Sequence, residues 1–182
     1  MSFSTRNLTL KDGSTFHIRE ATPQDASRMI DMVKEILGTS EYTLTQVEEF
    51  SYTIVQEEQY IQKHLSSENC LFLVAEQEGH LIGNVIFTNG SKRRDAHQGE
   101  FSMGIIQSHR NKGVGTALLE ALLDWAVENP NIKKVKLRVA MLNYPAIRLY
   151  RNYGFIEEGR LLREFKMDDG DYIDVFSLYK FV

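Results

Sequence analysis

Cysteine, proline and basic charge are all scarce in this sequence, and each scarcity excludes a class of protein. One cysteine in 182 residues excludes a disulfide scaffold and favours a reducing compartment. Three prolines with 42% hydrophobic residues fit neither collagen nor a disordered chain. Lys plus Arg number 21 against 25 for Asp plus Glu, a net charge of -4, whereas proteins that coat nucleic acid usually carry a basic excess. We therefore expect a globular protein with no nucleic-acid partner.

Long apolar runs are also missing. The longest covers residues 70–75 and is far shorter than the roughly 20 residues that span a bilayer. The segment 1–7 lacks the apolar centre of a secretory signal. We therefore expect no membrane partner and a cytoplasmic protein. The five histidines show neither H-x-H nor H-E-x-x-H spacing, so we expect no metal site.

The hydrophobic periodicity predicts a mixed order of helices and strands. Helical spacing of apolar residues predicts helices over 22–37, 46–65, 114–128 and 145–153. Alternating or continuous apolar runs predict strands over 8–10, 15–19, 70–76, 80–88, 100–106, 133–140, 155–162 and 172–179. Neighbouring strands at both ends of the chain argue against a purely parallel sheet. We therefore predict an α/β (α+β) fold with a single mixed, mostly antiparallel central sheet flanked by helices.

A glycine-rich turn stands between a predicted strand and the helix over 114–128. It reads Arg110-Asn111-Lys112-Gly113-Val114-Gly115. Glycine lets the backbone approach a ligand closely, and the unpaired amides of a helix N-terminus attract anions. Arg110 and Lys112 add positive charge, so the turn is predicted to hold phosphate, although such turns also occur without a ligand. It is neither a P-loop nor a G-x-G-x-x-G dinucleotide fingerprint.

A second cluster follows between residues 143 and 155. It consists of Asn143, Ala146, Tyr150, Gly154 and Phe155 in the pattern N-x-x-A-x-x-x-Y-x-x-x-G-F. With the R-x-x-G-x-G turn, this pattern resembles the GCN5-related N-acetyltransferase (GNAT) family, which uses acetyl-CoA. The resemblance covers residues 16–179 and is closest to the spermidine/polyamine acetyltransferase branch.

The resemblance implies a GNAT fold over residues 1–182 as one N-acetyltransferase domain, with acetyl-CoA as co-substrate. A strand end would pair with the pantetheine arm and help to hold the thioester oxygen, the amides of the turn would bind the pyrophosphate, and an asparagine would hydrogen-bond the pantetheine region. In this order, the implied cofactor-binding residues are Met103, Gly104, Ile105 and Ile106; Arg110, Asn111, Lys112, Gly113, Val114 and Gly115; and Asn143.

Two residues are candidates for catalysis. The resemblance implies that Tyr150 lies near the sulfur as general acid, and a phenol with a pKa near ~10 can protonate a leaving thiolate. Alternatively, Tyr150 is only a core aromatic on an amphipathic helix. Glu100 is the candidate general base, because its segment is similar to that of the polyamine acetyltransferases. Alternatively, Glu100 is a solvated or paired surface charge.

The stretch 35–62 contains glutamates but neither lysine nor arginine. Its acidic residues are Glu35, Glu41, Glu48, Glu49, Glu57 and Glu58. In the resembled family this region lines one wall of the acceptor site, where an acidic wall favours a cationic acceptor. Alternatively, the glutamates form a solvated helix face.

Together these features predict direct transfer of acetyl, within a ternary complex, to a primary amine. The acceptor is expected to be a polyamine-like small amine, or a protein N-terminus or lysine. The alternative function is a non-catalytic sensor that binds acetyl-CoA on the same fold. Retention of Tyr150 and Asn143 favours catalysis. The C-terminal strand hairpin offers an edge through which a homodimer could form.

Overall fold

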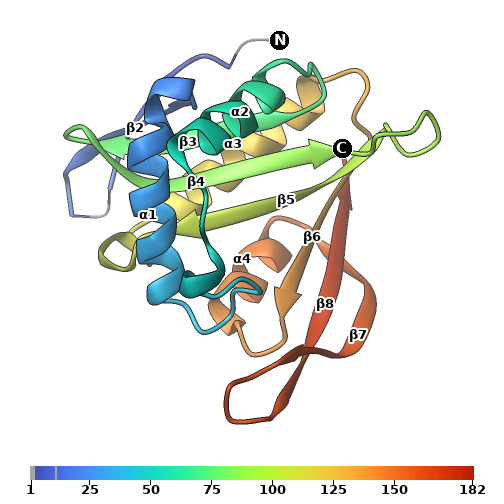
Figure 1. The fold of residues 1–182 in the computed structure, drawn as a ribbon. Coiled ribbons are helices and arrows are strands. Elements are labelled where there is room, and N and C mark those ends of the chain that lie inside the picture. Colours follow the sequence, from blue (N-terminus) through green and yellow to red (C-terminus); the bar gives the residue numbers. More distant parts are fainter. Residues whose placement is uncertain (1–2, 11) are drawn as a thin grey trace.

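The computed structural model describes residues 3–10 and 12–182. Its centre is an 8-stranded sheet in the order β1-β2-β3-β4-β5-β6-β8-β7 (Figure 1). Every neighbouring pair is antiparallel except β5 and β6, which are parallel. The strands are β1 (Arg6–Thr9), β2 (Thr15–Glu20), β3 (Leu71–Gln77), β4 (His80–Asn89), β5 (Gln98–Ile105), β6 (Lys134–Ala140), β7 (Ile156–Lys166) and β8 (Tyr172–Phe181). The predicted mixed, mostly antiparallel sheet is confirmed.

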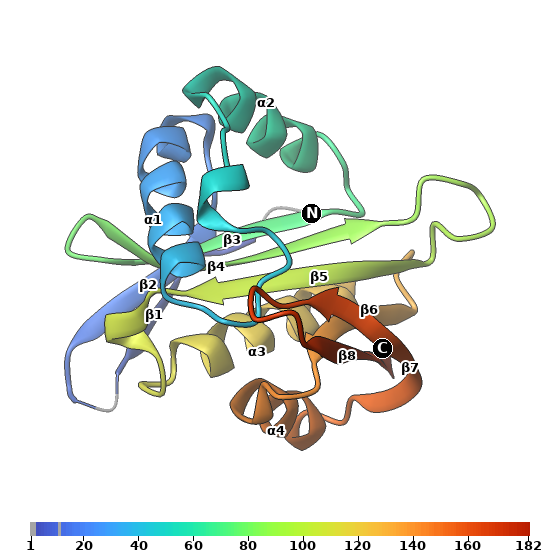
Figure 2. The same cartoon turned by 60° about the horizontal axis from the view of Figure 1, so that its bottom comes forward.

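Helices cover both faces of this sheet. The α-helices are α1 (Ala26–Gly38), α2 (Ile54–Leu65), α3 (Val114–Glu128) and α4 (Tyr144–Asn152). Figure 2 shows α1 and α2 on one face, with α3 and α4 on the other. No helix within the described ranges is long and apolar enough to cross a membrane.

The prediction of one helix over 46–65 is wrong in its first part. Val47–Glu49 forms only a 3-10 turn, and α2 begins at Ile54. Thr53 causes this start, because its hydroxyl accepts a hydrogen bond from the Gln56 amide at 3.2 Å. The Gln56 side chain accepts the Thr53 amide in return at 2.8 Å, which completes a capping box. A helix boundary is therefore fixed in the middle of the predicted helix.

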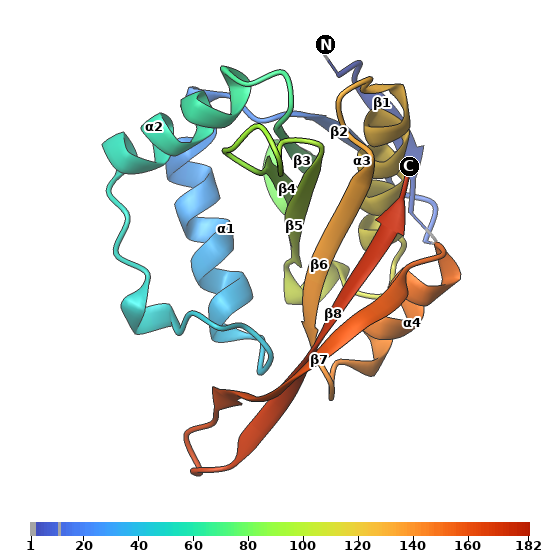
Figure 3. The ribbon, with the colours of Figure 1, turned by 90° about the vertical axis from the view of Figure 1, so that its right-hand side faces the viewer.

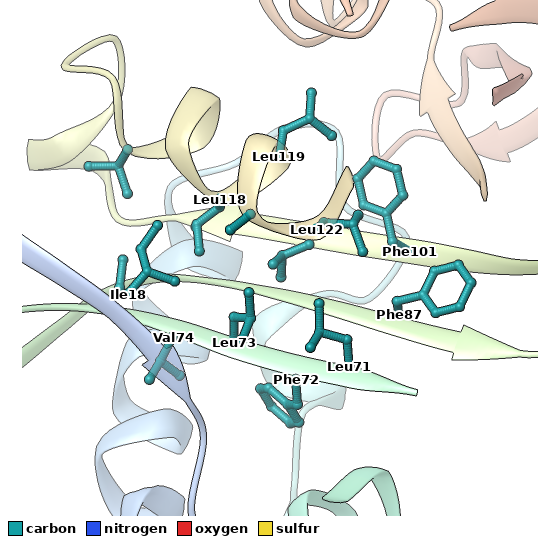
Figure 4. Close-up of a cluster of buried hydrophobic side chains, with 14 of the residues drawn as sticks. Ile18, Leu71, Phe72, Leu73, Val74, Phe87, Phe101, Leu118, Leu119 and Leu122 are labelled. Atoms are coloured by element: carbon teal, nitrogen blue, oxygen red, sulfur yellow. The ribbon is translucent and has the colours of Figure 1, made fainter. Parts of the chain in front are cut away.

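The strand β3 is buried on both faces of the sheet. Leu71 and Leu73 point toward α3, whereas Phe72 and Val74 point to the opposite face (Figure 4). This alternation is the two-residue period of a strand. Since helices cover both faces, the strand sequence is continuously apolar instead of alternating with polar residues.

The sheet opens between β5 and β6. Their parallel pairing extends only from Gln98–Lys134 to Glu100–Lys136. From there β6 stays paired with β8 as far as Ala140, and the two halves of the sheet diverge (Figures 1 and 3). Within the described chain, residues 101–105 have no partner strand on this side. Their backbone groups form an open edge in the middle of the fold.

An ion-pair network joins α1 to the sheet on the far side from this opening. Asp25 is 1% exposed, and its two carboxylate oxygens accept hydrogen bonds from Arg19 at 2.7 and 2.8 Å. Arg28 also pairs with Asp25, and Glu76 binds both arginines. Burial alone would raise the pKa of Asp25, but the bonds from Arg19, the Thr22 amide and Arg28 hold it well below its ordinary value.

We expect acid to destabilise the fold through Asp25. Its contribution is complete above the unfolded-state pKa, near ~3.9, and is lost as the pH falls toward the lower folded-state pKa. Between about pH 5 and pH 2, the free energy of unfolding should fall by about 2 kcal/mol more in the wild type than in Asp25→Asn. Urea unfolding at each pH measures the difference. An equal fall in both proteins would contradict this role of Asp25.

Candidate active site

A cavity of about 1250 Å³ opens where β5 and β6 diverge. Its walls come from α1, the chain between α1 and α2, α2 itself, β5, the start of α3, β6 and α4. Ordinary small-molecule pockets measure roughly 300–1,000 Å³, so this cavity is larger than most. Of the predicted site residues, those lining the cavity are Glu100, Met103, Gly104, Ile105, Arg110, Asn111, Gly113, Gly115, Asn143 and Tyr150.

Three predicted cofactor-binding residues lie outside the lining. Ile106 and Val114 have buried side chains in the hydrophobic core, and the Ile106 amide already donates to the Ile82 carbonyl at 3.2 Å. The Lys112 ammonium instead lies 3.5 Å from the Asp12 carboxylate, and both side chains are exposed. Contact through the backbone amides stays a prediction for Lys112 and Val114, whereas the Ile106 amide is engaged within the sheet.

The glycine turn has the backbone geometry of an anion site. Asn111 and Gly113 both have positive φ, at 62° and 106°, and Gly113 is the N-cap of α3. The Ala117 amide makes the first helical bond, to the Gly113 carbonyl at 3.0 Å. The amides ahead of Ala117 therefore have no acceptor within the helix, and they are free to bind an anion. A phosphate group fits this arrangement.

The side chain of Arg110 is anchored by hydrogen bonds within the protein. Its Nε donates to the Ile105 carbonyl at 3.1 Å, and its terminal nitrogens donate to the Thr39 carbonyl at 2.8 Å and hydroxyl at 2.9 Å. The guanidinium therefore ties the end of β5 to the end of α1. The turn offers its amides and the nearby charge of Arg110, while three of the five N–H donors of this side chain are occupied.

The strand end and Asn143 complete this wall. A Cβ on Gly104 would lie 2.9 Å from Ile36 Cδ1 and 3.2 Å from Asn84 Oδ1, so the glycine allows α1 to pack closely on β5. Asn143 caps α4, because its side-chain oxygen accepts the Ala146 amide at 3.3 Å. The capping oxygen faces the helix, which leaves the amide group of Asn143 as a donor at the cavity wall.

Tyr150 is packed as a core aromatic and also lines the cavity. The side chain is 7% exposed, and its ring contacts Phe101 and Phe155 edge-on, with centroids 5.7 and 5.9 Å away. Burial raises the pKa of Tyr150 to about 12. Tyr150 is therefore a core aromatic that lines the cavity, and its role as general acid stays a prediction.

Glu100 lies on the same cavity, opposite a residue that the sequence did not single out. Arg138 on β6 donates to Glu100 Oε1 at 2.9 Å and lies 3.7 Å from Glu164. Hydrogen bonding to Glu100 raises the pKa of Arg138 above its usual range. The pair spans the opening between β5 and β6. No local sequence pattern identifies it, because the two residues meet only through parallel strand pairing.

The acidic stretch divides between the cavity and the outer surface. Glu41, Glu49 and Glu57 line the cavity, whereas the other glutamates of this stretch do not. Glu57 is the most enclosed of the three, at 4% exposed. Glu49 is engaged in a local cap, since its carboxylate accepts the Gln46 amide at 2.8 Å. Part of the acidic stretch thus faces the cavity from the wall opposite the glycine turn.

This geometry agrees with the family match. Residues 31–155 match the family model described as Acetyltransferase (GNAT) family, and the chain belongs to that family. An acetyltransferase of the GNAT family from Streptococcus pneumoniae has a solved structure with a TM-score of 0.89 and 29% identity, covering 92% of this chain and 99% of that one. The resemblance and the fold that it implied are confirmed.

Curated relatives differ in acceptor. The spermidine N(1)-acetyltransferase of Vibrio cholerae is 36% identical over 59% of this chain and 61% of that protein, so the match spans less than two thirds of the relative. An N-alpha-acetyltransferase of Sulfurisphaera tokodaii is 29% identical over 88% of this chain and 92% of that protein. The yncA structure from Salmonella typhimurium, solved with acetyl-CoA, shares the fold at a TM-score of 0.80 and 18% identity, covering 91% of this chain and 93% of that one.

Proposed function

We propose that this protein is an acetyl-CoA-dependent N-acetyltransferase that acts on a cationic primary amine. The observation that carries this proposal is the meeting of three features in one cavity: the glycine turn, the open edge of β5 and Tyr150. Membership of the GNAT family supports it, as does the acetyl-CoA bound by the Salmonella neighbour of the same fold.

The residues of this cavity suit a direct transfer. When bound, acetyl-CoA supplies a thioester carbonyl that an amine can attack. The amides at Gly113 and Gly115 would hold the pyrophosphate, and the open edge of β5 would hydrogen-bond the pantetheine arm. Tyr150 would donate its proton to the departing sulfur. Cys70 is not part of the cavity lining and its thiol donates to Asn89 at 3.3 Å, so we propose no acetylated cysteine.

Glu100 is the proposed general base. Arg138 bonds to Oε1 of this carboxylate, and no described residue donates to Oε2. That oxygen is available to accept a proton from the attacking amine, directly or through a water. Arg138 would hold the carboxylate at the opening between the strands.

The acceptor is proposed to be a polyamine-like small amine. Four glutamates line the cavity against two arginines, and one of these arginines, Arg138, is paired with Glu100. The summed field of such a wall attracts cations. The name of the Vibrio relative points to the same class of acceptor. The Sulfurisphaera relative favours a second candidate, a protein N-terminus, which also presents a cationic amine.

Initial rates with a panel of amines test the function and the order of reaction. Polyamines, peptides with free N-termini, lysine peptides and aminoglycosides would be offered with acetyl-CoA, with thiol release and product mass as the two readouts. We expect turnover with a polyamine and intersecting double-reciprocal lines for the two substrates. Parallel lines would contradict the ternary complex. Binding of acetyl-CoA without thiol release across the panel would indicate the non-catalytic sensor.

A further inference from the structure

Glu57 is a buried carboxylate without a partner at the wall of the cavity. Its residue is 4% exposed. Among residues 3–10 and 12–182, none donates a hydrogen bond to its side chain or pairs with it. No described side-chain oxygen is both fully enclosed and unpartnered, so the Glu57 oxygens keep a small opening. Glu57 is also one of the residues that line the cavity.

Aromatic residues line the same cavity as Glu57. Phe50 stacks on Tyr52 with ring centroids 5.3 Å apart, and Tyr52 meets Tyr60 edge-on at 6.3 Å. Tyr60 in turn packs edge-on against Phe72 at 6.1 Å. All four rings line the cavity. Aromatic faces attract organic cations, and a carboxylate within such a group of rings adds the opposite charge.

Within residues 3–10 and 12–182, no lysine or arginine forms an ion pair with Glu57. The nearby imidazole of His64 donates from Nδ1 to the Tyr60 carbonyl at 2.9 Å, and its Nε2 then accepts the Thr88 hydroxyl at 3.0 Å. Both ring nitrogens are thus used by the neutral imidazole, and burial lowers the pKa of His64. The two arginines of the cavity are bonded elsewhere, as described above.

The chain holds Glu57 in this position at an energetic cost. The capping box of Thr53 fixes the first turn of α2, and Glu57 lies in that turn, where its amide donates to the Thr53 carbonyl at 3.0 Å. Burial raises the pKa of Glu57, which means that its ionised form is poorly solvated there. An ammonium group that entered the cavity would offset this loss of hydration. A metal ion suits the site less well, since the described residues offer no group of three acidic, histidine or cysteine ligands.

We propose that Glu57, with the rings of Tyr52 and Tyr60, binds a second, non-reacting ammonium of the acceptor. This inference rests on the proposed function and narrows the acceptor to amines with at least two cationic nitrogens. α2 lies on the face of the sheet opposite α4, which carries Tyr150 (Figure 2). A diamine that spans the cavity places one nitrogen near the reacting centre and the other at Glu57.

Glu57→Gln tests this assignment, with Glu58→Gln as the matched control. The control removes the same charge from the adjacent residue, which does not line the cavity. With 1,4-diaminobutane as acceptor, Glu57→Gln should raise KM by about tenfold to a hundredfold, the scale of a lost charge-assisted contact. With butylamine, which lacks the second nitrogen, KM should stay within about twofold of the wild type. Glu58→Gln should behave as the wild type with both amines.

Calorimetry with spermidine separates the failure of this inference from the failure of the proposed function. Spermidine should bind the wild type and Glu58→Gln in the absence of acetyl-CoA, and bind Glu57→Gln at least about tenfold more weakly. That pattern would support the subsite even if no amine in the panel were acetylated. Equal spermidine affinity in all three proteins would overturn the subsite while leaving acetyl transfer intact. An equal rise of KM for butylamine would overturn the second-nitrogen assignment, because it would place Glu57 at the reacting nitrogen.

Discussion

Tyr150→Phe is expected to slow the chemical step by about 10²-fold with little change in stability or in acetyl-CoA affinity. Phenylalanine keeps the ring contacts with Phe101 and Phe155 and removes only the hydroxyl. The pKa of about 12 keeps the phenol protonated throughout the physiological range. The same desolvated surroundings also raise the pKa of the departing thiol. The pKa of the proton donor and that of its acceptor therefore rise together. The loss should appear in kcat, because the proton moves in the transition state.

Tyr153→Phe is the matched control for this experiment. Tyr153 follows α4 directly, but its hydroxyl donates to Glu120 at 2.5 Å instead of lining the cavity. That hydrogen bond raises the pKa of Tyr153 to about 12, which is also the pKa of Tyr150. The two phenols therefore differ in that only Tyr150 lines the cavity. Single-turnover rates at saturating acetyl-CoA should be normal in Tyr153→Phe. If Tyr150→Phe were equally fast, Tyr150 would be a core aromatic only, and another group would have to protonate the sulfur.

Local chemistry explains which features could be predicted from the sequence. The helix over 114–128 has both predicted ends, because Gly113 adopts the positive φ of its N-cap and Pro130 follows its last turn. The positive φ of Gly113 within the glycine turn is equally local. The incorrect prediction of one helix over 46–65 also has a local cause, because the capping box of Thr53 and Gln56 starts the helix inside that range.

The remaining features depend on contacts between distant segments. Nothing near Arg110 indicates that Thr39 will bind its guanidinium, and the divergence of β5 from β6 follows from strand pairing across the whole sheet. Glu57 is an intermediate case. Glu57 shares the buried face of α2 with Ile61 and His64, which follow it by four and seven residues. This helical spacing indicates that Glu57 is buried, whereas the many glutamates of the segment suggest an exposed helix face.

Gly113 and Gly115 differ in backbone conformation, and this difference allows a test of acetyl-CoA binding that does not disturb the fold. A Cβ on Gly113 would meet no atom within 4 Å, but the φ of 106° there strains any other residue. Gly115 lies in the first turn of α3, and a Cβ there would make ordinary contacts of 3.7 Å with Met103 and 3.8 Å with Leu149. A side chain at position 115 is therefore compatible with the helix and extends into the cavity.

Gly115→Val is accordingly expected to lower acetyl-CoA affinity by about 10²-fold or more, while the unfolding free energy stays within about 1 kcal/mol of the wild type. The added methyl groups would stand where a pyrophosphate must approach the helix amides, and each lost charge-assisted bond weakens binding substantially. Calorimetry with acetyl-CoA and urea unfolding measure the two quantities. Gly159→Val is the control, because a Cβ on that glycine of β7 meets no atom within 4 Å and lies outside the cavity lining. If Gly115→Val bound acetyl-CoA as tightly as Gly159→Val, the phosphates would have to bind elsewhere. The positive φ angles of the turn would then serve only to start α3.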